Sequence, residues 1–252
     1  MSSEKPSNST SQTLPKNSSN FKSRWQNAYD TQAAPETLEG GTRQFNGYRH
    51  ARTYDLLRRS LHYAAAEWHN RRILDAGCGS GNTGAFLKSR NHLTGLDFSR
   101  QMARYAREVY PVVTVADVER LPFADSSFDA VLVAGVWQCL TPETPFLKEV
   151  HRVLRPDGEA IFGWVLNADY LLYRRGVTFR LDPSVSMNLL GAQEIPRLLD
   201  AAGLEVIRMY AVFFPIGVYG MKNVPGWLRP LVPAFTVQCK MQNEKKIMTN
   251  DQ

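Results

Sequence analysis

The sequence predicts an α/β fold with a doubly wound, mostly parallel β-sheet. Between about residues 72 and 166, short apolar runs alternate with segments whose apolar residues recur at helical spacing. Strands that alternate with helices form parallel sheets whose two faces are both covered. A glycine-rich turn follows the first apolar run, and an aspartate closes each of the next two. These features predict a ligand-binding edge on the sheet.

Seven strands are expected, and the first five belong to the regular alternation. Beyond about residue 167 the alternation of strands and helices becomes less regular, although two later apolar runs still have strand character. The expected strands lie at residues 72–77, 93–97, 112–117, 128–135, 159–166, 204–214 and 234–241. Helices are expected at residues 48–68, 82–90, 99–110, 143–154 and 191–203.

The composition is that of an ordinary globular domain. The chain has 252 residues, of which 43% are hydrophobic and 21% charged, so it can form one good-sized core with an added cap. A net charge of +6 would suit nucleic acid, an anionic membrane or an acidic ligand. Much of the excess lies near the N-terminus, however, and is expected to belong to a solvated tail. Its basic residues are Lys5, Lys16, Lys22 and Arg24, against Glu4.

The chain divides into a main domain, a cap and two tails. Residues 1–20 are rich in Ser and Asn and lack an apolar core, which predicts a disordered tail and no secretory signal. Residues 21–70 are expected to form a helical cap, residues 71–241 the main domain and residues 242–252 a loose tail. Within the main domain, residues 215–233 combine Pro, Gly and aromatic residues and are expected to form a lid.

The cysteines argue against a disulfide framework and against a structural metal site. Cys78, Cys139 and Cys239 are odd in number, far apart and without metal-ligand spacing. This usage favours a reducing, cytoplasmic compartment. No apolar run reaches the length of a membrane span, which leaves only peripheral membrane contact open. The sequence leaves the oligomeric state open.

The glycine-rich turn predicts a bound cofactor. Gly77, Gly79 and Gly81 have the spacing G-x-G-x-G, and such a turn between a strand and a helix lets the backbone approach a ligand closely. Asp97 closes the next strand, where a carboxylate can accept hydrogen bonds from both hydroxyls of a ribose. Asp117 closes the third strand and can accept from an adenine amino group.

Four runs of this sequence resemble the class I S-adenosylmethionine-dependent methyltransferases. They are "ILDAGCGSGNTG", "LTGLDFS", "ADVERLPFADSSFDAVL" and "FLKEVHRVLRPDG". Within that family, the similarity is to the ubiquinone/menaquinone-biosynthesis branch. It covers roughly residues 70–165, with a weaker similarity in "QEIPRLLDAAGLEV", whereas residues 1–45 and 215–233 match nothing in the family. The resemblance implies a Rossmann-like methyltransferase fold, a seven-stranded sheet whose last strand is antiparallel, and S-adenosylmethionine as cofactor.

The resemblance also implies which residues hold the cofactor. Asp75 and the loop formed by Gly77, Cys78, Gly79 and Gly81 would hold its methionine portion. Asp97 would bind the ribose, while Phe98 and Met102 would flank the adenine. Asp117 and Val118 would fix the adenine edge, and Ala134 and Gly135 would meet the methionine amino group.

The acceptor is expected to be a small apolar molecule, of lipid or natural-product character. The chain has "AGVWQCL" after the fourth strand, where nucleic-acid amino methyltransferases typically have "N-P-P-Y", so nucleic acid is not expected as a partner. Tyr48, Trp137, Gln138 and Trp227 are candidates for the acceptor pocket. His50 is the candidate catalytic base, although methyl transfer needs a base only when the acceptor is a weak nucleophile. Oxygen, nitrogen and carbon acceptors all stay open.

Two other functions fit parts of the pattern. A non-catalytic S-adenosylmethionine-binding protein would have the same binding residues. A nicotinamide-dependent oxidoreductase would also use an acid such as Asp97 for the ribose, but the G-x-G-x-G spacing and the "LPFADSSFDAVL" run oppose it.

Overall fold

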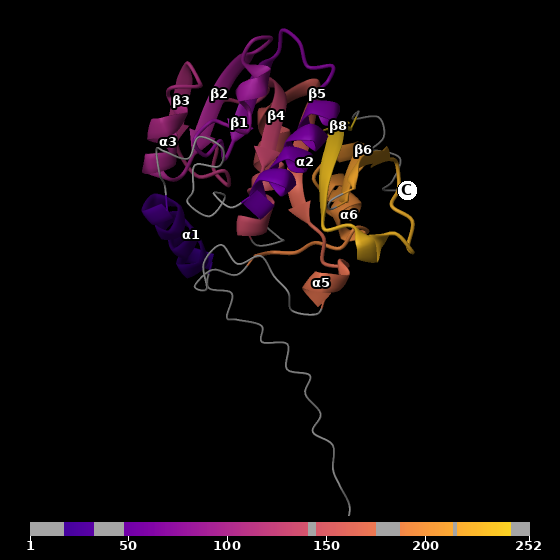
Figure 1. Cartoon of the computed structure of the whole chain (residues 1–252). Helices are drawn as coiled ribbons and strands as arrows, with labels where there is room; N and C mark the ends of the chain where they lie inside the picture. The colour runs from indigo at the N-terminus through magenta and orange to yellow at the C-terminus, as the bar shows by residue number, and fades with distance from the viewer. Residues whose placement is uncertain (1–17, 33–47, 141–144, 175–186, 214–215, 243–252) are drawn as a thin grey trace, which may run out of the picture.

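The computed structural model describes residues 18–32, 48–140, 145–174, 187–213 and 216–242. Within these residues, eight strands form one sheet with helices on both faces (Figure 1). The greater part of each predicted tail, residues 1–17 and 243–252, lies outside the described residues.

The strands agree with the predicted ones to within a few residues at most ends, except that the fifth begins earlier and one strand was not predicted. They are β1 (Arg72–Ala76), β2 (His92–Asp97), β3 (Val112–Val115), β4 (Phe128–Ala134), β5 (Leu154–Leu166), β6 (Leu204–Phe213), β7 (Gly217–Met221) and β8 (Ala234–Met241). The α-helices are α1 (Ser18–Gln32), α2 (Tyr48–Ala64), α3 (Arg100–Ala106), α4 (Phe146–Val153), α5 (Leu171–Arg174) and α6 (Glu194–Ala201). Short 3-10 helices lie at η2 (Ala85–Leu87), η3 (Trp137–Cys139) and η4 (Arg229–Leu231).

The sheet has the order β3-β2-β1-β4-β5-β8-β6-β7. Strands β1 to β5 are parallel, so their carboxyl ends meet at one edge. Strand β8 is inserted between β5 and β6 and runs antiparallel to both. The predicted doubly wound sheet with an antiparallel last strand is therefore confirmed.

Successive side chains of the central strands point alternately to the two faces of the sheet and pack into two separate hydrophobic cores. In β4, Val131 and Val133 pack with residues of α4 and α6, whereas Ala130 and Leu132 pack with residues of α2 on the opposite face. Figure 1 shows α2 crossing the sheet in front of its central strands. Because both faces are buried, residues 130–134 of the central strand β4 are all apolar, as expected for a parallel sheet.

Besides the earlier start of β5 and the unpredicted short helix α5, two elements differ from the sequence-based expectation. The predicted helix at residues 82–90 is a series of turns with only the short helix η2. A side chain at Gly84 would lie 2.3 Å from the Tyr110 hydroxyl, so this segment approaches the core too closely for larger residues. In addition, β7 makes eight strands instead of seven. It pairs antiparallel with β6, so the first part of the predicted lid is an edge strand of the sheet.

Helix α1 begins at Ser18, three residues inside the predicted disordered tail. Trp25 of α1 is only 1% exposed, and its cluster includes Phe98 and Cys139 from the carboxyl edge of the sheet. Figure 1 shows α1 next to α3 at that edge. The helix is thus packed on the domain, although its sequence gives no strong apolar stripe.

We expect removal of residues 1–17 to leave the melting temperature unchanged, because their Ser- and Asn-rich composition predicts a disordered tail and α1 begins at Ser18. Lys22→Met, in contrast, should cost about 0.2–1 kcal/mol of unfolding free energy, the usual range for a partly exposed ion pair. Thermal and urea unfolding of both proteins would measure this. A clear fall in the melting temperature of the truncated chain would contradict the boundary at Ser18.

Candidate functional site

A cavity of about 110 Å³ lies at the carboxyl edge of the sheet, where β1, β2 and β4 end. The glycine-rich turn forms one wall of the cavity. Residues at the ends of β2 and β4, together with Gln138 of η3, form the floor. Aromatic side chains from α1, α2 and β5 close the remaining sides. The lining residues are Tyr29, Tyr54, Gly77, Cys78, Gly79, Ser80, Asn82, Thr83, Asp97, Phe98, Ala134, Gly135, Gln138 and Trp164.

The glycine-rich turn requires glycine for two different reasons. Gly77 has φ +84°, and a Cβ there would lie 2.2 Å from Val136 Cγ2, so both the backbone and the space exclude a larger residue. Gly79 has φ +55°, and a Cβ there would meet no atom within 4 Å. The turn is therefore packed against the domain at Gly77, while at Gly79 it leaves open space for a ligand.

Asp97 holds the turn in place from the end of β2. Its carboxylate accepts hydrogen bonds from the backbone N–H of Gly79 at 2.8 Å and of Ser99 at 2.9 Å. Burial raises the pKa of Asp97 to about 6, although both N–H groups favour the ionised form. Asp97 is thus a buried acid at the cavity with capacity for further donors.

Asp75 is a second buried acid, located at the end of β1 and only 1% exposed. The Tyr110 hydroxyl donates to its Oδ2 at 2.5 Å and lies 3.2 Å from the carbonyl oxygen of Gly81. Its Oδ1 is buried without a hydrogen-bond partner in the described structure. Burial raises the pKa of Asp75 to about 7, and the nearby Asp97 adds to the rise. The unpaired oxygen marks a place where a donor from a ligand would be favourable.

Helix α1 makes polar contacts along the same edge. Lys22 Nζ lies 2.8 Å from Asp117 Oδ2 and also pairs with Glu119. Asp30 accepts a hydrogen bond from the Ser99 hydroxyl, directly beside Asp97. The region beyond the ends of β2 and β3 is therefore covered by α1.

Seven of the predicted cofactor residues line the cavity, and five do not. Those that line it are Gly77, Cys78, Gly79, Asp97, Phe98, Ala134 and Gly135. Asp75 and Gly81 lie in β1 and the glycine-rich turn but outside the lining. Met102 and Val118 are buried, and Asp117 is paired with Lys22.

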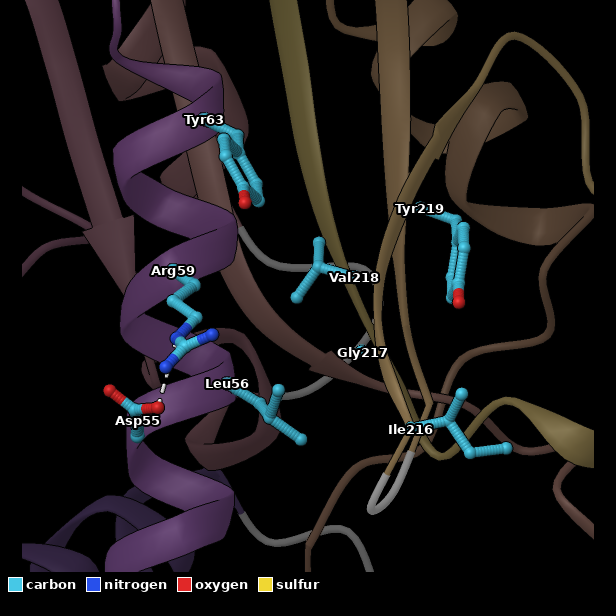
Figure 2. A pocket seen from close by; sticks show the side chains of 8 residues that line it. All are labelled: Asp55, Leu56, Arg59, Tyr63, Ile216, Gly217, Val218 and Tyr219. Atoms are coloured by element: carbon cyan, nitrogen blue, oxygen red, sulfur yellow. Dashed lines mark ion pairs between the residues drawn. The ribbon is translucent and has the colours of Figure 1, made fainter.

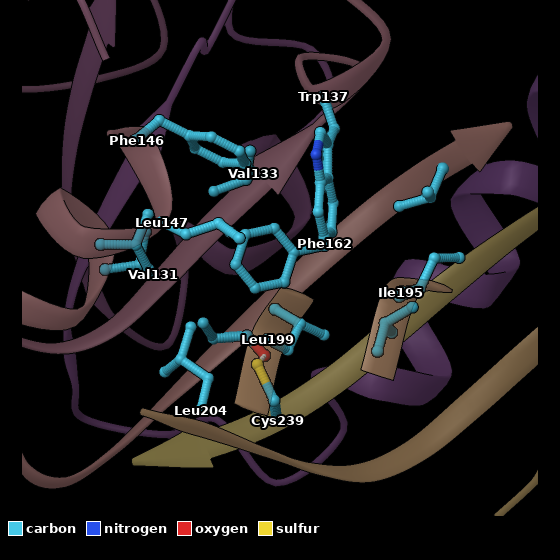
Figure 3. Packing of buried hydrophobic residues seen from close by; sticks show 14 of the residues in the cluster. Val131, Val133, Trp137, Phe146, Leu147, Phe162, Ile195, Leu199, Leu204 and Cys239 are labelled. Atoms are coloured by element: carbon cyan, nitrogen blue, oxygen red, sulfur yellow. Dashed lines mark hydrogen bonds between the residues drawn. The ribbon is translucent and has the colours of Figure 1, made fainter. Parts of the chain in front are cut away.

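The predicted acceptor residues are more scattered. Gln138 lines the cavity, whereas Trp137 is 2% exposed and packs against Phe146 and Phe162 in the core (Figure 3). Trp227 is 75% exposed and does not line this cavity. Tyr48 and His50 belong to α2, but their side chains lie outside the described part of the structure.

The beginning of the predicted lid borders a different hollow. Figure 2 shows a pocket of about 350 Å³ between α2 and the β6–β7 hairpin. An ion pair of 2.9 Å between Arg59 and Asp55 lies on its α2 side, and Ile216 and Tyr219 lie on the hairpin side. None of the described residues 216–233 lines the cavity at the glycine-rich turn.

The aromatic walls of the cavity did not emerge from the sequence. Tyr29 lies in α1, and Tyr54 lies in α2, where it packs edge-on against Trp164 with ring centroids 5.3 Å apart. Trp164 lies inside the continuous apolar run of residues 160–166, so its pattern indicates core packing. Ser80, Asn82 and Thr83 also line the cavity, and their position within the glycine-rich turn could have identified them.

Comparison with known families gives the same result as the geometry. Residues 74–162 match the family model described as "Methyltransferase domain". Residues 74–162 of this chain are therefore similar to a methyltransferase domain. This match confirms the resemblance inferred for residues 70–165, and it spans β1 to β5 with the glycine-rich turn and Asp97.

Relatives of this chain are named for methyl transfer. A probable S-adenosylmethionine-dependent methyltransferase of Mycolicibacterium smegmatis is 30% identical over 151 residues, which cover 59% of this chain and 57% of that protein. A ubiquinone/menaquinone biosynthesis C-methyltransferase of Geotalea uraniireducens is 32% identical over 102 residues, covering 36% of this chain and 43% of that protein. The matches thus span about half of these relatives' length.

Solved structures of methyltransferases share the fold of this chain. The 1,6-didemethyltoxoflavin-N1-methyltransferase of Burkholderia thailandensis, solved with bound S-adenosylhomocysteine, superposes with a TM-score of 0.57 at 16% identity. The match covers 90% of this chain and 89% of that one.

In the part of the chain that the structure describes, no helix is both long and apolar enough to cross a membrane.

Proposed function

We propose that this chain binds S-adenosylmethionine at the carboxyl edge of its sheet and directs the methyl group to an apolar small-molecule acceptor. The observation that carries the proposal is the pair of buried acids, Asp75 and Asp97, at the ends of adjacent strands around the glycine-rich turn. Ligands of open parallel sheets bind at this edge. The methyltransferase domain match and the names of the relatives support the same cofactor.

The residues present fit this cofactor chemically. The unpaired Oδ1 of Asp75 is a suitable acceptor for an ammonium group, and Asp97 has acceptor capacity left for hydroxyl groups. The open space at Gly79 would admit the ligand close to the backbone. The cofactor supplies an activated methyl group when it is bound.

The chain's own residues then have to bind the cofactor and the acceptor, orient the two molecules and exclude water. The cavity of about 110 Å³ is smaller than the roughly 300 Å³ at which small-molecule sites begin, so we expect the covering side chains of α1 and α2 to move outward on binding. Tyr29 and Tyr54 are the side chains that these helices place over the cavity. Their return over the bound molecules would exclude water and hold the acceptor in line.

Calorimetric titration with S-adenosylhomocysteine tests the cofactor assignment without an acceptor. We expect binding of this molecule and no binding of a nicotinamide dinucleotide; the opposite result would favour an oxidoreductase. Formation of S-adenosylhomocysteine from S-adenosylmethionine across a panel of small acceptors tests the transfer. Binding of S-adenosylhomocysteine without turnover of any acceptor would favour the non-catalytic binding protein.

A further inference from the structure

The buried polar atoms of the cavity wall without a hydrogen-bond partner in the described structure include Asn82 Nδ2 in the glycine-rich turn and two atoms of opposite hydrogen-bonding character beside Gly135. Gln138 Oε1 is an acceptor, and Trp164 Nε1 is a donor; neither has a hydrogen-bond partner in the described structure. Both residues line the cavity. Buried polar atoms of native proteins are normally paired, and an exception in a pocket indicates a group that a ligand completes.

The backbone around Gly135 brings the two side chains together. Gly135 has φ +73°, and a Cβ there would lie 3.0 Å from Trp164 Cε3 and 3.6 Å from Gln138 Nε2. The indole and the amide therefore both lie beside this glycine, at the carboxyl end of β4. Both side chains therefore border the same part of the cavity.

Trp164 reaches the cavity through a strained backbone. It has φ +64°, which is uncommon for a residue of this size, and the register of β5 with β8 shifts between Phe162 and Val165. Such strain costs on the order of 1–3 kcal/mol and clusters at functional sites. The irregularity allows an aromatic residue of a central strand to line the cavity and to pack edge-on against Tyr54.

The charge of the lining narrows the class of ligand further. Among the described residues that line the cavity, Asp97 is the one charged residue, and none is Lys, Arg or His. An anionic acceptor would therefore find no counterion among these residues, whereas the rings of Tyr29, Tyr54 and Trp164 suit a planar apolar body.

We propose that Gln138 and Trp164 form the acceptor subsite, and that it takes a neutral, planar aromatic molecule carrying a hydroxyl group. A hydroxyl group carries both the donor that would pair with Gln138 Oε1 and the acceptor that would pair with Trp164 Nε1, so its chemistry matches both unpaired atoms. An amide N–H donates but does not accept, and a carboxylate accepts but does not donate. This inference rests on the proposed function, because it assigns the cofactor to the rest of the cavity.

The subsite can be tested by binding alone, with the protein saturated by S-adenosylhomocysteine. The probes are 2-naphthol, 2-methoxynaphthalene, which keeps the oxygen acceptor but lacks the O–H, and 2-naphthoate, which is anionic. We expect 2-naphthol to bind about tenfold more tightly than 2-methoxynaphthalene, the effect of one lost hydrogen bond, and 2-naphthoate to bind most weakly.

Two variants separate the two hydrogen bonds. Gln138→Leu should remove the preference for 2-naphthol over 2-methoxynaphthalene, since only the hydroxyl proton needs Gln138. Trp164→Phe should weaken the binding of 2-naphthol and of 2-methoxynaphthalene by a similar factor, since both molecules keep the oxygen that accepts from Nε1. Gln242→Leu, a matched change at the opposite edge of the sheet, should leave all probe affinities unchanged.

The outcomes distinguish the subsite from the cofactor assignment. If S-adenosylhomocysteine does not bind the wild-type protein, the proposed function fails. If it binds, but the three probes bind equally, 2-naphthoate binds best or none binds, the subsite proposal is overturned while the cofactor site stands. All variants should keep the wild-type affinity for S-adenosylhomocysteine; a loss in Gln138→Leu would assign Gln138 to the cofactor and overturn its role here.

Discussion

Asp97→Ala should lower the affinity for S-adenosylhomocysteine by tenfold or more, measured by calorimetric titration. A hydrogen bond to a charged group contributes about 1.5–3 kcal/mol, and each 1.4 kcal/mol corresponds to a factor of about ten in affinity. The loss of affinity should exceed that caused by removing a residue that only contacts the ligand. Asp97 also accepts from the backbone N–H of Gly79, so its removal frees the glycine-rich turn that forms the cavity wall.

Two further variants decide which role of Asp97 dominates. Asp97→Asn keeps one acceptor oxygen and should retain more of the affinity than Asp97→Ala. Asp125→Ala, which removes a carboxylate far more exposed than that of Asp97, should leave the affinity unchanged. An affinity for S-adenosylhomocysteine that is the same in Asp97→Ala and wild type would refute the assignment of Asp97 to the ribose.

The sequence predicts the parts of the site that are dictated by backbone geometry. The turn at Gly77 needs a positive φ and has no room for a side chain, so only glycine fits and the pattern is visible in the sequence. Asp97 is likewise predictable, because it is a polar residue at the end of an apolar run. The order of strands and the two buried faces follow from the same alternation.

The rest of the site depends on tertiary packing that leaves no local pattern. Tyr29 belongs to α1, whose contacts are a few specific pairs, such as Asp30 with the Ser99 hydroxyl, and not a continuous apolar stripe. Trp164 lies in the apolar second half of β5, residues 160–166, and the register of β5 with β8 shifts beside it. Strand β7 was missed because its glycines indicate a loop, although an edge strand needs only one pairing partner.

The pH dependence of the free protein should reveal the two buried acids. Burial raises the pKa of Asp75 to about 7 and that of Asp97 to about 6, so the folded chain holds these protons more tightly than the unfolded chain does. The stability that these groups contribute is therefore fully present below about pH 4. It is lost as the pH rises through about 6 and 7. Acids with lowered pKa values, such as Glu149, act in the opposite direction, so the acids must be isolated by substitution.

Asp75→Asn isolates the larger of these shifts. Asparagine resembles the protonated acid, so the variant should match the wild type near pH 4. It should then gain stability relative to the wild type by at most about 1.4 kcal/mol per pH unit as the pH rises to about 7. Urea unfolding of the free proteins at several pH values would measure this difference. A constant difference would mean that Asp75 is ionised throughout and that its burial is compensated by partners other than Tyr110.

The same substitution should have the opposite effect on ligand binding. A donor placed on the unpaired Oδ1 of Asp75 favours the ionised acid, so wild-type affinity for S-adenosylhomocysteine should rise with pH up to about 7, with release of a proton on binding. Calorimetry in buffers of different ionisation enthalpy would detect that proton. Asp75→Asn should bind more weakly near pH 8 and release less. Stability gained and affinity lost in one variant would indicate that the buried acid is retained for the ligand at the expense of the fold.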